Sequence, residues 1–166
     1  MEKNEAFTNC SRLGKIRIIV TEDDDIFYSA TDVARAMGYR SPRDAVQTHC
    51  EHIQTFYHRA GAGFQSMNFI YWMEVPYLAI GMPTERALNV YRWLFKELPP
   101  AIQGILAGKY SRSGLLKREG VFYQADKDDN METNLNTITL ILDQALESKA
   151  KKGGGAHGRT PAVHEG

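Results

Sequence analysis

The pattern of apolar and polar positions predicts four short β-strands in the first half of the chain. Each strand is a run of β-branched and aromatic residues. The first two runs are joined by an acidic turn at residues 22–25, which predicts a β-hairpin. The other two flank Gly61-Ala62-Gly63 and predict a β-ribbon with a flexible tip. The runs are Lys15–Val20, Ile26–Ala30, Ile53–Arg59 and Ser66–Trp72.

Two short helices are predicted between the strand pairs. Thr31 can cap the first helix, and Gly38 is placed to end it. Ser41 can cap the second, with Pro42 at its first helical position, and helical spacing then continues to Cys50.

Helical spacing returns after the second strand pair. Residues 74–80 predict a short helix, and residues 84–98 predict a longer one with a single apolar stripe. Pro99-Pro100 is expected to end that helix, and residues 101–106 can form a further turn or two.

These elements predict an α+β fold, in which short antiparallel β-hairpins pack with several short helices and one longer amphipathic helix. We expect one domain over residues 12–110 and a charged linker over 111–131. Residues 132–148 predict an amphipathic helix, either packed on the domain or mediating homo-oligomerisation, because its apolar repeat covers less than two heptads. The Gly-rich residues 149–166 are expected to form a disordered tail.

The composition is that of a globular protein with a real core. The 166 residues are 43% hydrophobic and 24% charged, and 20 basic side chains balance 20 acidic ones. A uniformly basic, histone-like binder is therefore excluded. No apolar run is long enough to span a membrane, and the polar N-terminus lacks the pattern of a signal peptide. Two cysteines are too few for a disulfide scaffold, so we expect a reduced, cytoplasmic protein.

Charge is unevenly distributed along the chain. Residues 84–118 carry a net charge of +5, whereas residues 119–150 carry −5. The basic segment can contact phosphate. Equally, the two segments can pair with each other or be solvated.

The order of motifs in the first half resembles that of a known family. A strand is followed by an aromatic residue, Asp-Val, Gly-Tyr, and a Pro-led helix that ends at His-Cys. The matching residues are Phe27, Ala30, Asp32, Val33, Met37, Gly38, Tyr39, Pro42, Ala45, His49 and Cys50. This order resembles the N-terminal domain of the baculovirus BRO proteins, which many phage and prophage antirepressors share.

The second half extends the resemblance to about residues 12–110. The matching residues are Phe69, Ile70, Glu74, Tyr77, Leu78, Trp93, Glu97, Leu98, Pro99, Ile102, Gly108, Lys109 and Tyr110. Two departures remove positive charge that the family often carries, at Ile80-Gly81-Met82-Pro83 and at Gln103. Larger relatives append a second domain, for which this chain has too few residues after Tyr110.

The resemblance implies a phage- or prophage-encoded gene regulator in the cytoplasm of a bacterial host. The leading hypothesis is an antirepressor-like protein that acts by binding a repressor or another regulatory protein. Neutral net charge and the lost basic residues favour this over tight DNA binding. The alternative is a regulator that binds double-stranded DNA.

Candidate nucleic-acid-binding residues fall into two groups. The first lies around the turn between the two short helices, whose plan is that of a DNA-reading motif, and comprises Arg35, Arg40, Ser41 and Arg43. Asp32 and Asp44 can neutralise two of these arginines. The second group comes from the basic segment and comprises Arg92, Lys96, Lys109 and Arg112.

Other chemistry is weakly supported. No phosphate-cradling loop or nucleophile elbow occurs, so we expect neither catalysis nor a cofactor. His49 and Cys50 are adjacent on one helical turn and point about 100° apart, which argues against a shared metal ion. Phe64 and Gln65 at the ribbon tip can either anchor a partner or fold back on the sheet.

Overall fold

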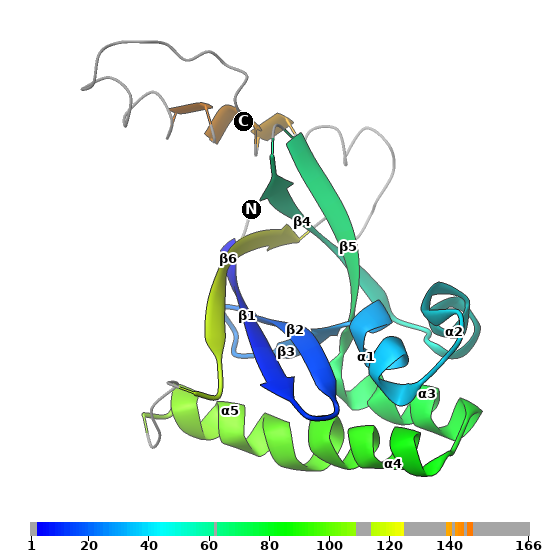
Figure 1. Cartoon of the computed structure of the whole chain (residues 1–166). Helices are drawn as coiled ribbons and strands as arrows, with labels where there is room; N and C mark the ends of the chain where they lie inside the picture. The colour runs from blue at the N-terminus through cyan, green and yellow to red at the C-terminus, as the bar shows by residue number, and fades with distance from the viewer. Residues whose placement is uncertain are drawn as a thin grey trace.

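The computed structural model describes residues 3–61, 63–108, 114–124 and a few positions between 139 and 147. Six antiparallel strands close into a barrel in the order β1-β2-β3-β5-β4-β6. The helices between β3 and β6 lie below the barrel and to its right in Figure 1. The α+β class and the antiparallel pairing are confirmed. The strands are β1 Lys3–Ser11, β2 Gly14–Val20, β3 Ile26–Ser29, β4 Ile53–Ala60, β5 Gly63–Tyr71 and β6 Lys117–Gln124.

Helices fill the chain between the strands. Two lie between β3 and β4, and the rest form a nearly continuous run after β5. They are α1 Ala30–Met37, α2 Pro42–His49, the 3₁₀ turn η1 Trp72–Glu74, α3 Val75–Gly81, α4 Glu85–Tyr91, the π-helical segment η2 Arg92–Glu97, and α5 Leu98–Leu106.

Two strands lie outside the predicted domain limits. β1 precedes residue 12, and β6 lies within the predicted linker, so the expectation of a linker is wrong for residues 117–124. β1 pairs with both β2 and β6, and without these two strands the barrel would not close. Sequence patterning missed β1 because several of its buried positions are polar, including Asn4, Thr8 and Asn9.

The described residues of the predicted 132–148 segment are helical, and the rest of that segment lies outside the described residues. The predicted tail, 149–166, also lies outside them.

Alternation along the strands separates two cores. On β2, Ile16 and Ile18 face the helices, whereas Ile19 faces the other way. Every strand contributes to the second cluster, so that cluster fills the barrel interior. Its members are Ala6, Ile19, Phe56, Phe69 and Phe122, with Phe27 and Met67 packed against them.

Local caps differ in part from the expectation. The predicted cap Thr31 lies inside α1, and the N-cap is Ser29, whose hydroxyl accepts from the Asp32 N–H at 3.4 Å. Gly38 ends α1 in the left-handed conformation, as predicted. Ser41 is the N-cap residue of α2 but its side chain makes no capping hydrogen bond. The predicted helix that starts at residue 84 is α4, and its N-cap Thr84 accepts from the Ala87 N–H.

The expectation that Pro99-Pro100 ends the long helix is wrong. Helical structure runs from α4 through η2 into α5, with both prolines in the first turn of α5. The Leu98 N–H donates to the Trp93 carbonyl, five residues back. Proline has no backbone N–H, so a helix tolerates it where that N–H would not be needed for a helical hydrogen bond. The π-helical spacing of η2 creates such a place before α5.

This arrangement leaves the carbonyl of the buried Leu94 in need of a donor. The usual partner of the Leu94 carbonyl is the Leu98 N–H, which is already used, and the next residue, Pro99, has no N–H. The fully buried Tyr28 hydroxyl donates to the Leu94 carbonyl at 2.8 Å. A side chain of β3 therefore supplies a hydrogen bond that the helix covering the barrel cannot make by itself.

A second polar link joins β2 to α1. β3 pairs with β2 only at Ile18, Ile19 and Val20, so residues 14–17 of β2 have no neighbouring strand on that side. There the Arg17 N–H donates to Asp32 Oδ2 at 3.0 Å, and the Arg17 guanidinium donates to both carboxylate oxygens at 2.8 and 2.7 Å. The buried carboxylate thus replaces the missing strand as an acceptor and fixes α1 against the barrel.

We expect Tyr28→Phe to lower the free energy of unfolding by about 1–3 kcal/mol, because it leaves a buried carbonyl without a donor. Tyr39→Phe is the matched control. Its hydroxyl also donates to a helix carbonyl, that of Leu78 at 2.7 Å, but Tyr39 is half-buried and water can replace it. Urea unfolding of both variants measures the difference; equal losses would contradict this account of Leu94.

We expect Asp32→Asn to cost about 2–3 kcal/mol, somewhat less than a fully buried ion pair, because the Arg17 guanidinium is partly exposed. Arg35→Gln serves as the control. Arg35 also donates to Asp32, at 3.2 Å, but its side chain is 64% exposed, and its loss should cost no more than about 1 kcal/mol. The same unfolding measurement applies, and a loss for Asp32→Asn no larger than for Arg35→Gln would argue against the proposed role of Asp32.

Candidate functional site

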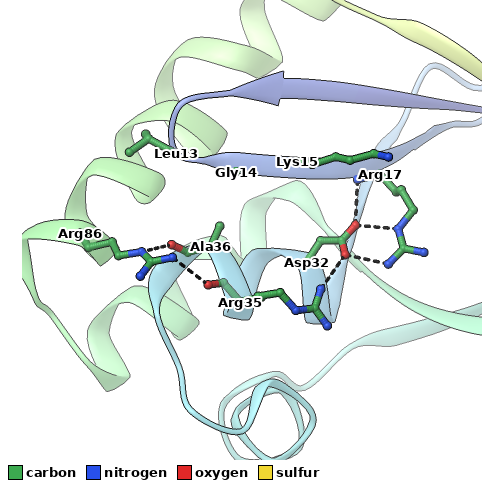
Figure 2. A pocket seen from close by; sticks show the side chains of 8 residues that line it. All are labelled: Leu13, Gly14, Lys15, Arg17, Asp32, Arg35, Ala36 and Arg86. Atoms are coloured by element: carbon green, nitrogen blue, oxygen red, sulfur yellow. Dashed lines mark hydrogen bonds and ion pairs between the residues drawn. The ribbon is translucent and has the colours of Figure 1, made fainter.

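A hollow of about 490 Å³ lies between β2, the exposed side of α1 and the start of α4. Figure 2 shows Lys15 and Arg17 extending from β2, and Asp32 and Arg35 on α1. Arg86 of α4 lies at the C-terminal end of α1. Leu13, Gly14 and Ala36 complete the lining. Four of the lining residues are basic and one is acidic.

The single carboxylate does not neutralise this hollow. Asp32 accepts from both Arg17 and Arg35. The hydrogen bond to Asp32 is the main cause that raises the pKa of Arg17 above its ordinary value, so the guanidinium stays charged. Arg86 donates to the Ala36 carbonyl at 2.7 Å and the Arg35 carbonyl at 3.4 Å (Figure 2). These carbonyls belong to the last turn of α1, where a cation is favourable.

A second hollow, of about 480 Å³, lies between α2 and β5 and shares Arg17 with the first. Most of its other lining residues have side chains that can form hydrogen bonds, and the only charged residue among them is Arg43. They are Thr31, Arg43, Val46, Gln47, Gln65, Ser66, Met67 and Asn68. Guanidinium and amide groups offer donors and acceptors in the geometry that base edges and phosphates accept.

The structure brings part of the first predicted group together. Arg35 lines the first hollow and Arg43 the second. Arg40 and Ser41 are exposed at the turn between α1 and α2. Asp32 faces Arg17 and Arg35.

The second predicted group lies elsewhere. Arg92 lines a smaller hollow of about 250 Å³ with Arg12, and bonds Asn89 at 3.4 Å. The Lys96 ammonium lies 5.9 Å from the centre of the Tyr91 ring. Neither residue lines the first two hollows. Lys109 and Arg112 lie outside the described residues.

The predicted partner-binding residues lie on β5. Gln65 is exposed and lines the second hollow, whereas Phe64 is half-buried and pairs across the hairpin with Arg59.

Sequence reasoning missed two basic residues of the site, Lys15 and Arg17. The sequence could have indicated both Lys15 and Arg17. They alternate with Ile16 and Ile18 along a strand, so the two basic side chains share the face opposite to the two isoleucines. Arg86 was counted only as part of a basic segment, and nothing in the sequence places it at the end of α1.

His49, Cys50 and the nearby His52 lie in three different environments. The His49 ring packs 5.9 Å from Tyr39, and His52 Nδ1 lies 2.9 Å from the buried Glu74 carboxylate. Cys50 is in the core, and burial raises the pKa of its thiol to about 12. Within the described ranges, no three side chains of the metal-ligating types come together.

No helix in the described part of the chain has the length and apolar character to cross a membrane. Searches of curated proteins and of solved structures found no match to the chain.

A family model matches residues 15–100, from the start of β2 to the beginning of α5; it is described as the BRO family, N-terminal domain. This domain occurs in regulatory and antirepressor-type proteins of phages and baculoviruses, a regulatory and non-enzymatic family. The match spans more than half of the chain and includes both helices of the α1–α2 pair, together with every described basic residue of the two hollows. The chain therefore belongs to the BRO family, whose N-terminal domain it carries, and has a regulatory role.

Proposed function

We propose that this chain is a phage- or prophage-encoded gene regulator that binds double-stranded DNA through the face formed by the two hollows. The observation that carries the proposal is the clustering of charge. Five basic side chains and one carboxylate line two hollows that meet at Arg17. A concentrated basic face is the electrostatic footprint expected of a nucleic-acid-binding protein, even when net charge is zero.

The two hollows suit different contacts. Lys15, Arg35 and Arg86 offer positive charge with little else that could distinguish bases, which suits phosphate. Arg43 and Gln47 are exposed on α2, beside Gln65 and Asn68 of β5. Arginine and amide side chains pair with guanine and adenine edges, so this side of the face suits base recognition.

The order of elements supports the same interpretation. α1 and α2 are joined by a short turn. α2 buries Ala45 and Val46, and its exposed residues are Arg43, Asp44, Gln47 and Thr48. The plan of helix, turn and helix presents its second helix to the major groove.

We expect purified protein to bind random-sequence duplex DNA in fluorescence anisotropy, with affinity that falls steeply between about 50 and 200 mM salt. The double variant Arg40→Glu/Arg43→Glu should bind more weakly, and the slope of log K against log salt should become shallower by about one to two. Neither side chain makes a structural ion pair among the described residues, so the fold should persist.

Arg92→Glu/Lys96→Glu is the matched control, because it makes the same charge change on the other predicted surface. We expect its salt slope to equal that of the wild type. An equal loss in both double variants would mean that only overall charge matters, and no binding at about 50 mM salt would overturn the proposal.

The second candidate is antirepressor activity through contact with a repressor or another regulatory protein. Family membership supports it, and the exposed Gln65 with the half-buried Phe64 offers a contact point at the hairpin end. Pull-down from the native host should then recover a DNA-binding repressor, and Phe64→Ala should weaken the recovery. Partners that disappear on nuclease treatment would favour the DNA proposal instead.

A further inference from the structure

A further hollow, of about 180 Å³, continues the interior of the barrel. Ala6, Phe69 and Phe122 of the interior cluster line it, and Met67, which packs against that cluster, lines it as well. We call this space the barrel hollow. Small barrels often hold one ligand. The barrel hollow is smaller than the ~300–1,000 Å³ typical of drug-sized sites, so it suits a ligand the size of a single ring.

Polar side chains from four strands line the barrel hollow together with these apolar ones. They are Thr8 of β1, Lys15 and Arg17 of β2, His58 of β4 and Glu119 of β6. Lys15 and Glu119 are exposed, so the hollow opens to solvent between them, whereas Thr8 is buried. An apolar wall with a few convergent polar groups is the usual composition of a small-molecule site.

His58 lacks a hydrogen-bond partner inside this hollow. Its ring stacks on Phe122 with centres 4.6 Å apart, and Phe122 meets Phe69 edge to face at 5.9 Å. His58 Nε2 is buried, yet no group in the described part of the chain forms a hydrogen bond with it. Burial lowers the pKa of His58 below its ordinary value and the Arg17 charge lowers it further, so the ring is neutral at neutral pH. A buried nitrogen of this kind needs a partner from a bound molecule or from water.

The charges that line the barrel hollow favour a single negative charge on its ligand. Lys15 and Arg17 stand against one carboxylate, that of Glu119, which leaves one positive charge. Asp32 also accepts from Arg17, but it pairs with Arg35 as well, so these two further charges do not alter the balance. A monocarboxylate matches this balance better than a phosphate dianion does.

The Arg17 guanidinium retains donors for such a carboxylate. Its Nε and Nη2 donate to Asp32. Among the described residues, Nη1 donates only to the Met67 sulfur, at 3.6 Å, and a thioether sulfur is a weak acceptor. Glu119 is held apart from this role, because its Oε2 accepts from the Thr8 hydroxyl at 2.7 Å. A carboxylate oxygen would be a stronger acceptor for Nη1 than the sulfur.

We propose that the barrel hollow binds a small carboxylate with a flat apolar body. The carboxylate accepts from Arg17 and from the Lys15 ammonium, and the flat body packs against the rings of Phe69 and Phe122. The ligand, or a water that it holds, supplies the partner of His58 Nε2. Lys15 and Arg17 also line the first hollow, so this site meets the basic face from the barrel side. Binding of the carboxylate does not depend on DNA.

Benzoate is the probe, added to the full-length chain with carbon-13 in its methionine methyl groups. Met67 lines the barrel hollow, and its signal is assigned with Met67→Leu; the exposed Met73 does not line it and is the internal control. We expect a saturable shift of the Met67 signal and none of the Met73 signal, with a Kd of about 1 mM for a ligand of this size. Benzamide has the same shape without the charge and should bind about tenfold more weakly.

Three variants test the roles of single groups. Lys15→Gln should weaken benzoate binding about fivefold, and His58→Phe, which keeps the ring and removes Nε2, about threefold. Glu119→Gln should tighten binding, because it removes a like charge and retains an acceptor for the Thr8 hydroxyl. Lys96→Gln is the matched control for Lys15→Gln: it makes the same charge change outside the hollow and should leave binding unchanged.

Several results would overturn the proposal. Absence of a saturable Met67 shift at about 10 mM benzoate would mean that the hollow does not take this ligand. Equal affinity for benzamide would remove the role of charge. Unchanged binding in both Lys15→Gln and His58→Phe would place benzoate elsewhere, and weaker binding in Glu119→Gln would indicate a cation site. No DNA is present in these measurements, so their outcome is separate from that of the DNA-binding experiment.

Discussion

The attachment of α1 to the barrel depends on one buried carboxylate. β3 is only four residues long, and where it turns into α1 the edge of β2 is left without a neighbour. Asp32 occupies this gap and accepts three hydrogen bonds from Arg17. A buried carboxylate is costly unless it is paired and hydrogen-bonded, and here its partners come from a strand and from its own helix. The position of α1, and of the α2 that packs against it, follows from this contact.

The long helical run is attached by a comparable device. Two prolines enter a continuous helix because η2 shifts the hydrogen bonding by one residue, and the carbonyl left over is satisfied by Tyr28. In both places a short strand, β3, supplies or creates the link: Tyr28 lies within it, and Asp32 follows its end. The helices therefore cover the barrel in one fixed arrangement, since a buried polar group that lost its partner would be destabilising.

The same arginine that serves the fold also joins the two hollows of the basic face. Asp32 occupies one side of the Arg17 guanidinium, while 41% of the side chain remains exposed. A chain of neutral net charge thus presents a positive face, because Asp32 is the one acidic residue that lines the two hollows, against five basic ones. Net charge informs on solubility and association, whereas the local field depends on which charges the fold brings together.

The sequence by itself determined the local elements. The strand Lys15–Val20 and the helix starts at Pro42 and Thr84 depend on near neighbours, and these predictions were confirmed. Tertiary structure alone decided the barrel, because β1 and β6 are more than 100 residues apart and each gains its hydrogen bonds only from the other strands. It also decided the continuity through Pro99, which needed a donor from β3. Arg35 and Arg43 were recognisable from the motif, but Arg17 and Arg86 joined them only through folding, since charges distant in sequence meet when the chain packs.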